Sequence, residues 1–337
     1  MARTRKDPKD NHLPKRVYRG RSAYEFKHPD GRTIRLCSLD SDKSVIWSHY
    51  EKLINEDKCT ETYASLVEEF FKSVDFMDLS GETQKDYTKY SRKVLPVFGK
   101  MKPDNIKPEH IRKYMDKRGL NSRTQANREK TFMSRVFRWG YERGKVKSNP
   151  CQGVKQFKEV ARERYITDRE YNALYQSAPT IIQVAMELAY LCCARQHDVL
   201  TLTKEQLLDE GIYIRQGKTG KKQIKAWSER LRKAIKLAKQ LPLTVTIPSL
   251  YVLHQKNGCK YSRDGFNSRW QAAREIAAAN NPDISFDFTF HDLKAKGISD
   301  LDGTLQDKQK ISGHKTITQT ARYDRKIQVV PVVGNQK

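Results

Sequence analysis

The sequence has no hydrophobic run long enough to cross a bilayer. Its longest apolar-rich stretch, residues 181–194, is short and contains Gln183 and Glu187, whereas a membrane-spanning helix needs about 20 mostly apolar residues. The first ten residues are charged and lack the apolar segment of a secretory signal. We therefore expect a soluble intracellular protein with no membrane partner.

The chain also lacks the cysteine patterns of zinc sites and disulfide frameworks. Its six cysteines, at positions 37, 59, 151, 192, 193 and 259, are scattered, with no C-x-x-C motif and no matching histidine spacing. This usage fits a reducing compartment, and the adjacent Cys192 and Cys193 are expected to be buried thiols in an apolar run. We expect neither a metal ion nor another cofactor.

Acidic residues are too few to balance the basic ones. The chain has 65 lysines and arginines against 40 acidic residues, which gives a net charge of +25 at pH 7. Such an excess favours a polyanionic partner, because protein cations displace the counterions condensed on a phosphate backbone. An indifferent basic surface is the weaker alternative. An anionic membrane surface is another, but no long basic amphipathic helix supports it.

The N-terminal residues combine a basic tail with alternating bulky and polar positions. The alternation at 16–19, 23–27 and 33–36, with a turn at 29–31, predicts a small three-stranded sheet. A sheet with a basic tail suits DNA binding in a groove, although an ordinary hairpin with solvated charges has the same pattern. A short helix and a linker are expected over 40–58. The candidate DNA contacts are Arg3, Arg5, Lys6, Arg16, Arg19 and Arg21.

The next segment has the period of amphipathic helices. An apolar stripe runs from Tyr63 to Val74, and a long helix over 122–143 places residues up to Tyr141 inward. The outer side of that helix is basic, and few acidic residues accompany it. Charge on a helix face is usually only solvated, but here we favour phosphate contact. The predicted contacts are Arg123, Arg128 and Arg135.

A change in composition separates this bundle from a larger mixed domain. Residues 145–160, with Asn149-Pro150 and several lysines, predict a linker. Beyond it we expect a helix capped by Thr167, a buried helix over 181–194, and strands over 211–215 and 223–227 joined by a turn at 217–220. Later residues are helical, except for an extended tail over 328–333.

Several polar residues of this larger domain are candidates for chemistry. Arg195 follows the buried helix, and Asp198 three residues later is placed to orient its guanidinium. Without the other motifs, a helix-end arginine that caps carbonyls would be the simpler interpretation. The remaining candidates are Lys218 in the turn, the pair His291 and Lys294 one helical turn apart, His314 after Gly313, and Tyr323 nine residues later.

In this order and spacing, these residues resemble the catalytic set of the tyrosine recombinases. Residues 216–220, Gln-Gly-Lys-Thr-Gly, resemble the hairpin that carries the catalytic lysine of that family. Residues 1–40 resemble the arm-type DNA-binding domain of lambda-type phage integrases, and 60–150 resemble the helical core-binding domain. Two departures are visible. Lys294 stands where the family has the arginine of His-x-x-Arg, and Cys192-Cys193 stands where Thr-Gly often precedes the first arginine.

The resemblance implies a multidomain α+β fold in three parts. These are a three-stranded arm-type domain with linker (1–58), an all-α core-binding bundle (59–152) and a mainly α catalytic domain with a small sheet (162–337). It implies a site-specific recombinase that integrates and excises a mobile element through a 3′-phosphotyrosine. Tyr323 would be the nucleophile, Lys218 the general acid and His291 the proton-transfer or phosphate-orienting group. Arg195, Lys294 and His314 would supply positive charge to the phosphate.

The resemblance also implies partners and a location. These are double-stranded DNA at core-type and arm-type sites, a homotetramer on DNA, a host DNA-bending protein and an excisionase, in the nucleoid of a bacterial host's cytoplasm. The alternatives are a non-catalytic DNA-binding protein derived from such a recombinase, a chromosome-dimer resolvase or transposon integrase, and a type IB topoisomerase. The arm-like N-terminus and separate core-binding unit argue against the topoisomerase.

Overall fold

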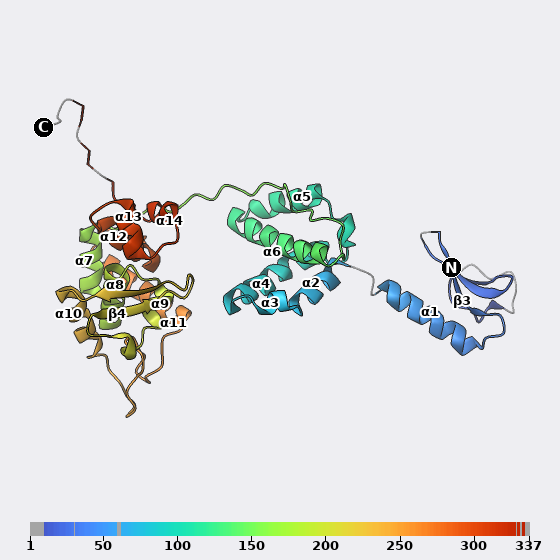
Figure 1. The fold of residues 1–337 in the computed structure, drawn as a ribbon, viewed down its shortest axis with the longest axis horizontal. Coiled ribbons are helices and arrows are strands. Elements are labelled where there is room, and N and C mark those ends of the chain that lie inside the picture. Colours follow the sequence, from blue (N-terminus) through green and yellow to red (C-terminus); the bar gives the residue numbers. More distant parts are fainter. Residues whose placement is uncertain (1–9, 30, 59–61, 328, 331, 334–337) are drawn as a thin grey trace. The chain divides into compact units, whose positions relative to one another are not determined.

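A computed structural model of the chain describes residues 10–29, 31–58, 62–327, 329–330 and 332–333. The chain divides into two compact units, residues 1–160 and 161–337. Within the described residues, no helix is both long and apolar enough to cross a membrane. Figure 1 shows the elements of each unit in sequence colours.

The N-terminal part is a small antiparallel sheet covered by one helix. Strands β1 (Val17–Arg19), β2 (Ala23–Lys27) and β3 (Thr33–Ser38) lie in the order β1-β2-β3, and α1 (Lys43–Lys58) follows them (Figure 1). Val17, Phe26 and Leu36 on the sheet pack with Ile46 of α1 in one hydrophobic cluster. The three predicted strands are therefore present.

The second part of this unit is a helical bundle. It contains α2 (Tyr63–Phe71), α3 (Val74–Met77), α4 (Gly81–Phe98), the short 3-10 helix η2 (Pro103–Asn105), α5 (Pro108–Gly119) and α6 (Arg123–Glu142). Helix α6 packs against α2, α4 and α5, and its inward residues, among them Phe132 and Val136, belong to the bundle core. The Ser122 side chain accepts a hydrogen bond from Gln125 N–H, which begins α6 as expected.

Two residues expected on the inner faces of these helices are exposed. The stripe that starts at Tyr63 ends before Val74, which is 73% exposed, because Ser73 caps a separate helix α3 and Phe76 enters the core instead. Tyr141 is 59% exposed. At the end of α6, Trp139 and Gly140 take the buried positions.

The segment after α6 is less of a linker than its composition predicts. Val146 and Cys151 are part of the bundle core. The Asn127 side chain donates to the carbonyl of Phe157 at 2.9 Å and accepts from the Phe157 N–H at 2.9 Å. Residues up to Phe157 are therefore attached to α6.

The second unit is mainly helical with one hairpin. Its elements are α7 (Asp168–Ser177), α8 (Thr180–Leu191), α9 (Gln196–Leu200), η3 (Lys204–Gln206), β4 (Gly211–Arg215), β5 (Lys222–Ala226), α10 (Glu229–Ala238), α11 (Arg263–Asn280), α12 (Phe290–Asp300), α13 (Leu305–Ser312) and α14 (Ile317–Ala321). The buried helix α8 packs against α10 and α12, and β4 pairs with β5 antiparallel. The mixed fold expected from the sequence is confirmed.

Helix α8 ends three residues before the end of the predicted 181–194 helix. It ends at Leu191, and Cys193 adopts a left-handed backbone conformation with φ of 49°. This conformation is unusual for a residue with a side chain. The turn that results puts Arg195 in extended backbone at the start of α9.

Candidate active site

Arg195 is fixed by a glutamine of the hairpin. Its Nη1 donates to Oε1 of Gln216 at 2.6 Å, and Gln216 is itself buried. The Nη2 atom of Arg195 is buried and has no hydrogen-bond partner among the described residues. A buried guanidinium N–H without a partner costs free energy, so this atom is available to an anion that enters the site.

Asp198 acts differently from the sequence-based expectation. Among the described residues it forms no ion pair with Arg195; its Oδ1 accepts from the backbone N–H of Gly217 at 2.9 Å. Thr219 Oγ1 donates to Gln216 Oε1 at 2.8 Å. Asp198 thus fixes the turn between β4 and β5, and Lys218 at the tip of that turn is exposed.

The hairpin is joined to the end of α13, the helix before His314. Gln216 Nε2 donates to Ser312 O at 2.9 Å and Gln223 Nε2 donates to Lys310 O at 2.6 Å. The ammonium of Lys225 donates to Ile311 O. The last carbonyls of a helix have no partner within the helix. Here the Gly313 N–H caps the carbonyl of Gln309, and the hairpin side chains supply donors to the three carbonyls that follow.

Gly313 is required at this contact. Its φ is 67°, and a Cβ atom there would lie 2.5 Å from Gln216 Nε2 and 2.6 Å from Gln223 Oε1. The left-handed conformation alone favours glycine. Here the hairpin side chains also occupy the space that a larger residue would need.

Lys294 is buried instead of facing the open site. It is 1% exposed, and its Nζ donates to Cys193 O at 2.6 Å and to Ser312 O at 3.4 Å. Burial, followed by the nearby charge of Arg195, lowers the pKa of Lys294 to about 7. Lys294 therefore acts as a brace: its hydrogen bonds connect the turn before Arg195 with the turn before His314. The sequence had suggested that its charge would bind the phosphate.

His314 is buried in the same cluster. Its Nδ1 lies 3.3 Å from Thr320 Oγ1, and its Nε2 has no partner among the described residues. Burial and the charges of Lys294 and Arg195 lower the pKa of His314 to about 4. At neutral pH the ring is uncharged, so it offers a hydrogen bond where the sequence suggested a positive charge.

Tyr323 lies against both histidines. Its hydroxyl is 2.7 Å from His291 Nε2, and its ring centroid is 4.8 Å from that of His314. Burial raises the pKa of Tyr323, although Arg195 and Arg325 oppose this shift. Partial desolvation by the surrounding protein lowers the pKa of His291, with further lowering from Lys294 and Arg325, although the charge of Asp292 opposes this shift. A neutral His291 can accept the phenol proton.

The backbone around Tyr323 is held on both sides. Ser299 Oγ donates to Tyr323 O at 3.0 Å and accepts from the Arg325 N–H at 2.7 Å. Lys308 Nζ pairs with Asp324 at 2.9 Å, and both side chains are largely buried. The sequence analysis assigned no role to these flanking residues, and their spacing gave no periodic signal.

The structure therefore brings most of the predicted site together. Arg195, His291, Lys294, His314 and Tyr323 are linked by contacts or by mutual electrostatic effects. Lys218 lies two residues from Gln216, in the turn next to this cluster. Sequence reasoning missed the glutamines, although Gln216 begins the motif that drew attention to the turn. In the described part of the chain, no group of three His, Cys, Asp or Glu residues could hold a metal ion.

Most of the residues predicted to contact DNA are exposed, and three of them lie outside the described part of the chain. Arg16, Arg19 and Arg21 are exposed, whereas Arg3, Arg5 and Lys6 lie outside the described residues. On α6, Arg123 and Arg128 are exposed, and Arg128 also pairs with Glu159 at 3.5 Å. Arg135 is partly buried and lines a pocket of about 460 Å³ with Lys130 and Arg138.

The fold and this cluster agree with one known family. The model of the phage integrase family matches residues 164–328, and that of the phage integrase central domain matches residues 63–156. The chain belongs to the phage integrase family.

Individual relatives agree with this assignment. The integrase of Escherichia phage HK022 is 28% identical over 209 residues, which are 56% of this chain and 54% of that protein. The chain spans about half the length of the curated relatives that it matches.

Two solved structures share the fold at 18% identity. The first, a lambda integrase dimer bound to a COC′ core site, has a TM-score of 0.69 and covers 98% of this chain and 100% of that one. The second, a lambda integrase tetramer bound to a Holliday junction, has a TM-score of 0.66 and covers 91% of this chain and 97% of that one.

Proposed function

We propose that the protein is a site-specific DNA recombinase of the phage integrase type. It would cut and rejoin DNA strands through a covalent 3′-phosphotyrosine intermediate to integrate and excise a mobile element. The observation that carries this proposal is the 2.7 Å contact between the Tyr323 hydroxyl and His291 Nε2, in the same cluster as Arg195 Nη2, which is buried and has no hydrogen-bond partner in the described part of the chain. A phenol becomes a strong nucleophile when a neighbouring base removes its proton.

The chemistry can be assigned atom by atom. The Tyr323 oxygen attacks the phosphorus, the new P–O bond forms a 3′-phosphotyrosine, and the bond to the 5′-oxygen breaks. His291 takes the phenol proton, and Lys218 gives a proton to the departing 5′-oxygen. Arg195 Nη2 and the His314 ring contact the phosphate oxygens, whose negative charge grows in the transition state. The 5′-hydroxyl of the partner strand reverses these steps on the same groups.

The division of labour follows the likeness to the integrases. Residues 1–58 would bind arm-type sites, 59–152 core-type sites, and 162–337 would carry the chemistry on double-stranded DNA. The exposed Arg16, Arg19 and Arg21 and the basic side of α6 support DNA contact. A homotetramer on DNA, a host DNA-bending protein, an excisionase and a place in the nucleoid of a bacterial cytoplasm complete the proposal.

A non-catalytic DNA-binding protein is the second candidate, and Lys294 is the feature that raises it. It is less favoured because Lys294 holds the turns before Arg195 and His314 in place. A site that had lost its function would not need to keep these groups arranged around Tyr323. A chromosome-dimer resolvase shares the same chemistry and would differ in having no second class of DNA site.

A suicide substrate tests the proposal directly. A nicked duplex that contains a candidate attachment site, taken from the DNA beside the reading frame, should trap a covalent protein–DNA adduct. The adduct should be absent with Tyr323→Phe. An adduct that persists in that variant would assign the nucleophile elsewhere, and a protein that binds the duplex without an adduct would support the non-catalytic alternative. Footprinting at two separate site types would separate an integrase from a resolvase.

A further inference from the structure

The carboxylate of Asp292 accepts more hydrogen bonds than a helix cap requires. It is 1% exposed and lies in the first turn of α12, next to His291. Its Oδ2 accepts from the N–H and the hydroxyl of Thr289, both at 2.8 Å, which is an ordinary capping arrangement. The same carboxylate also pairs with Arg162 Nε at 3.0 Å and with Arg325 Nη1 at 2.6 Å.

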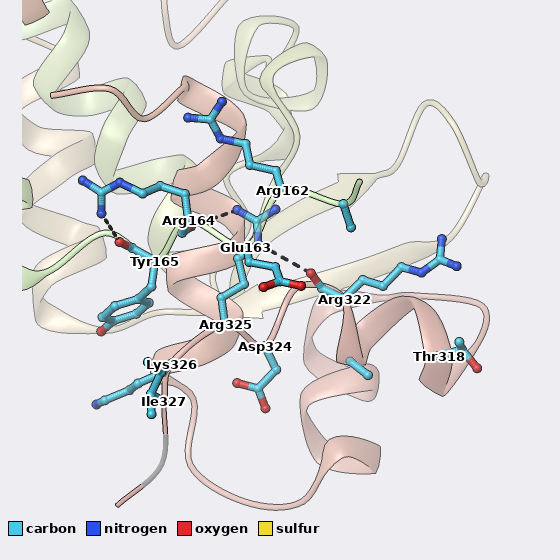
Figure 2. Close-up of a pocket in the computed structure, with 12 residues that line it drawn as sticks. Arg162, Glu163, Arg164, Tyr165, Thr318, Arg322, Asp324, Arg325, Lys326 and Ile327 are labelled. Atoms are coloured by element: carbon cyan, nitrogen blue, oxygen red, sulfur yellow. Dashed lines mark hydrogen bonds between the residues drawn. The ribbon is translucent and has the colours of Figure 1, made fainter. Parts of the chain in front are cut away.

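These two arginines are far apart in the sequence of the second unit, although both contact Asp292. Arg162 lies in the segment that enters the unit, and Arg325 is two residues after Tyr323. Arg325 Nη1 also donates to Arg164 O at 3.0 Å, and Arg162 Nη2 donates to Asp287 O at 2.7 Å. Figure 2 shows residues 162–165 beside Arg322 and residues 324–327, around a pocket of about 920 Å³.

Asp292 is the buried partner of both ion pairs, whereas the Arg162 side chain is 45% exposed and that of Arg325 is 9% exposed. Burial alone would raise the pKa of Asp292, but the Thr289 N–H and Arg325 hold that pKa below its usual value, so the group is charged. A buried carboxylate that loses one arginine must rearrange its remaining bonds. Because Arg325 N–H also donates to Ser299 Oγ at 2.7 Å, a shift of Arg325 moves the backbone that holds Tyr323.

We infer that Asp292 is a positioning residue that links the segment entering the second unit to the nucleophile segment. Through Arg162 it is connected to the chain that arrives from the DNA-binding bundle. Through Arg325 it sets the position of Tyr323. Because Asp292 is also the neighbour of His291 in the chain, it fixes the base and the nucleophile relative to each other. The entering segment therefore influences how closely Tyr323 approaches its phosphate. This inference rests on the proposed function only for its effect on cleavage.

The test compares Arg162→Gln with Arg169→Gln. Both are arginine-to-glutamine changes near the start of the unit, but the Arg169 pair with Asp283 is exposed and does not touch Asp292. Hydrogen–deuterium exchange should be faster over residues 318–327 in Arg162→Gln, and at Arg325 N–H above all, but unchanged there in Arg169→Gln. Unchanged exchange in Arg162→Gln would overturn the link. This measurement needs no activity, so it stands even if no adduct ever forms.

Cleavage kinetics test the functional half. At saturating duplex, Arg162→Gln should slow single-turnover adduct formation at least several-fold while DNA affinity falls by less, and Arg162→Lys should restore part of the rate. The fold-reduction in rate for the double variant Arg162→Gln/Arg325→Gln should be smaller than the product of the two single-variant reductions, because both arginines act on one carboxylate. Multiplicative effects, or a loss of affinity that explains the whole change, would overturn the positioning role. Asp292→Asn removes the charge of the carboxylate itself. If this variant fails to fold, the results for the arginine variants decide whether Asp292 has a positioning role.

Discussion

The hydroxyl of Tyr323 lies 2.7 Å from Nε2 of His291, although the two residues are 32 positions apart in the chain. The distance is that of a strong hydrogen bond. Because the pKa of His291 is lowered and the pKa of Tyr323 is raised, the phenol carries the proton and the imidazole accepts the bond. In the proposed reaction, His291 would take this proton when the Tyr323 oxygen attacks the phosphate.

Replacement of His291 should slow cleavage without abolishing DNA binding. We expect His291→Ala to reduce the rate of adduct formation by about 10²-fold or more, the usual contribution of a positioned base. Since the pKa of His291 is below 6.5, the contribution of His291 to the wild-type rate should be constant around neutral pH and should fall only in more acidic buffer. In His291→Ala, this decrease in rate at acidic pH should be absent. The same decrease in rate at acidic pH in the variant would show that another group titrates.

His314 should make stability depend on pH. Its pKa is about 4 in the folded protein and near 6.5 when unfolded. The unfolded chain therefore binds the proton first, so this contribution is complete above pH 6.5 and is lost as pH falls toward 4. Urea unfolding of the wild type should show the loss, on the order of 3 kcal/mol. His314→Asn should remove most of it; an identical pH profile in that variant would exclude His314 as the source.

Lys294→Met should weaken both the fold and the reaction. Methionine fills a similar volume but leaves Cys193 O without the lysine donor, while Ser312 O keeps only its bond from Gln216. An unsatisfied buried group costs about 1–3 kcal/mol. We expect a lower melting temperature and at least a tenfold slower cleavage, because the turns before Arg195 and His314 lose their shared support. Lys310→Met is the matched control on α13, since that side chain is 81% exposed. Equal effects of the two changes would contradict the brace.

Gly313→Ala should separate backbone strain from the loss of the hairpin contact. The control is Gly144→Ala, because Gly144 has the same φ of 67° but nothing within 4 Å of its added Cβ. Strain of this kind costs about 1–3 kcal/mol, and both variants should show it in the unfolding of their own unit. Only Gly313→Ala should also displace Gln216 and slow cleavage. Normal cleavage in that variant would mean that the hairpin is not set by this contact.

Local patterns were sufficient to predict the order of the elements. The alternation over 16–36, the turn at 217–220 and the Thr167 cap each depend on neighbouring residues, and each is present in the structure. The stripe beyond Phe71 failed because one serine side chain, Ser73, begins a new helix. The spacing of apolar residues cannot reveal such a break between two helices when the first apolar residue of the second helix falls at the spacing expected for the first.

The site was harder to predict, because its geometry depends on contacts between distant residues. Residue type and spacing indicated Arg195, His291 and Tyr323, but not which partner each would take. Asp198 was assigned to Arg195 from sequence proximity, yet it binds the Gly217 N–H. Lys294 was judged from its charge, whereas its burial decides what that charge can reach. Asp292 and Arg325, 33 positions apart, could be paired only in three dimensions.

The end of α13 has a consequence for how this unit folds. Its final carbonyls accept hydrogen bonds from Gln216, Gln223 and Lys225, which precede them by 96, 87 and 86 positions. The last turn of this helix has no complete set of partners until the hairpin has docked. We therefore expect helix α13 and the β4–β5 hairpin to gain and lose their structure as one cooperative element, with His314 in place only when both have formed.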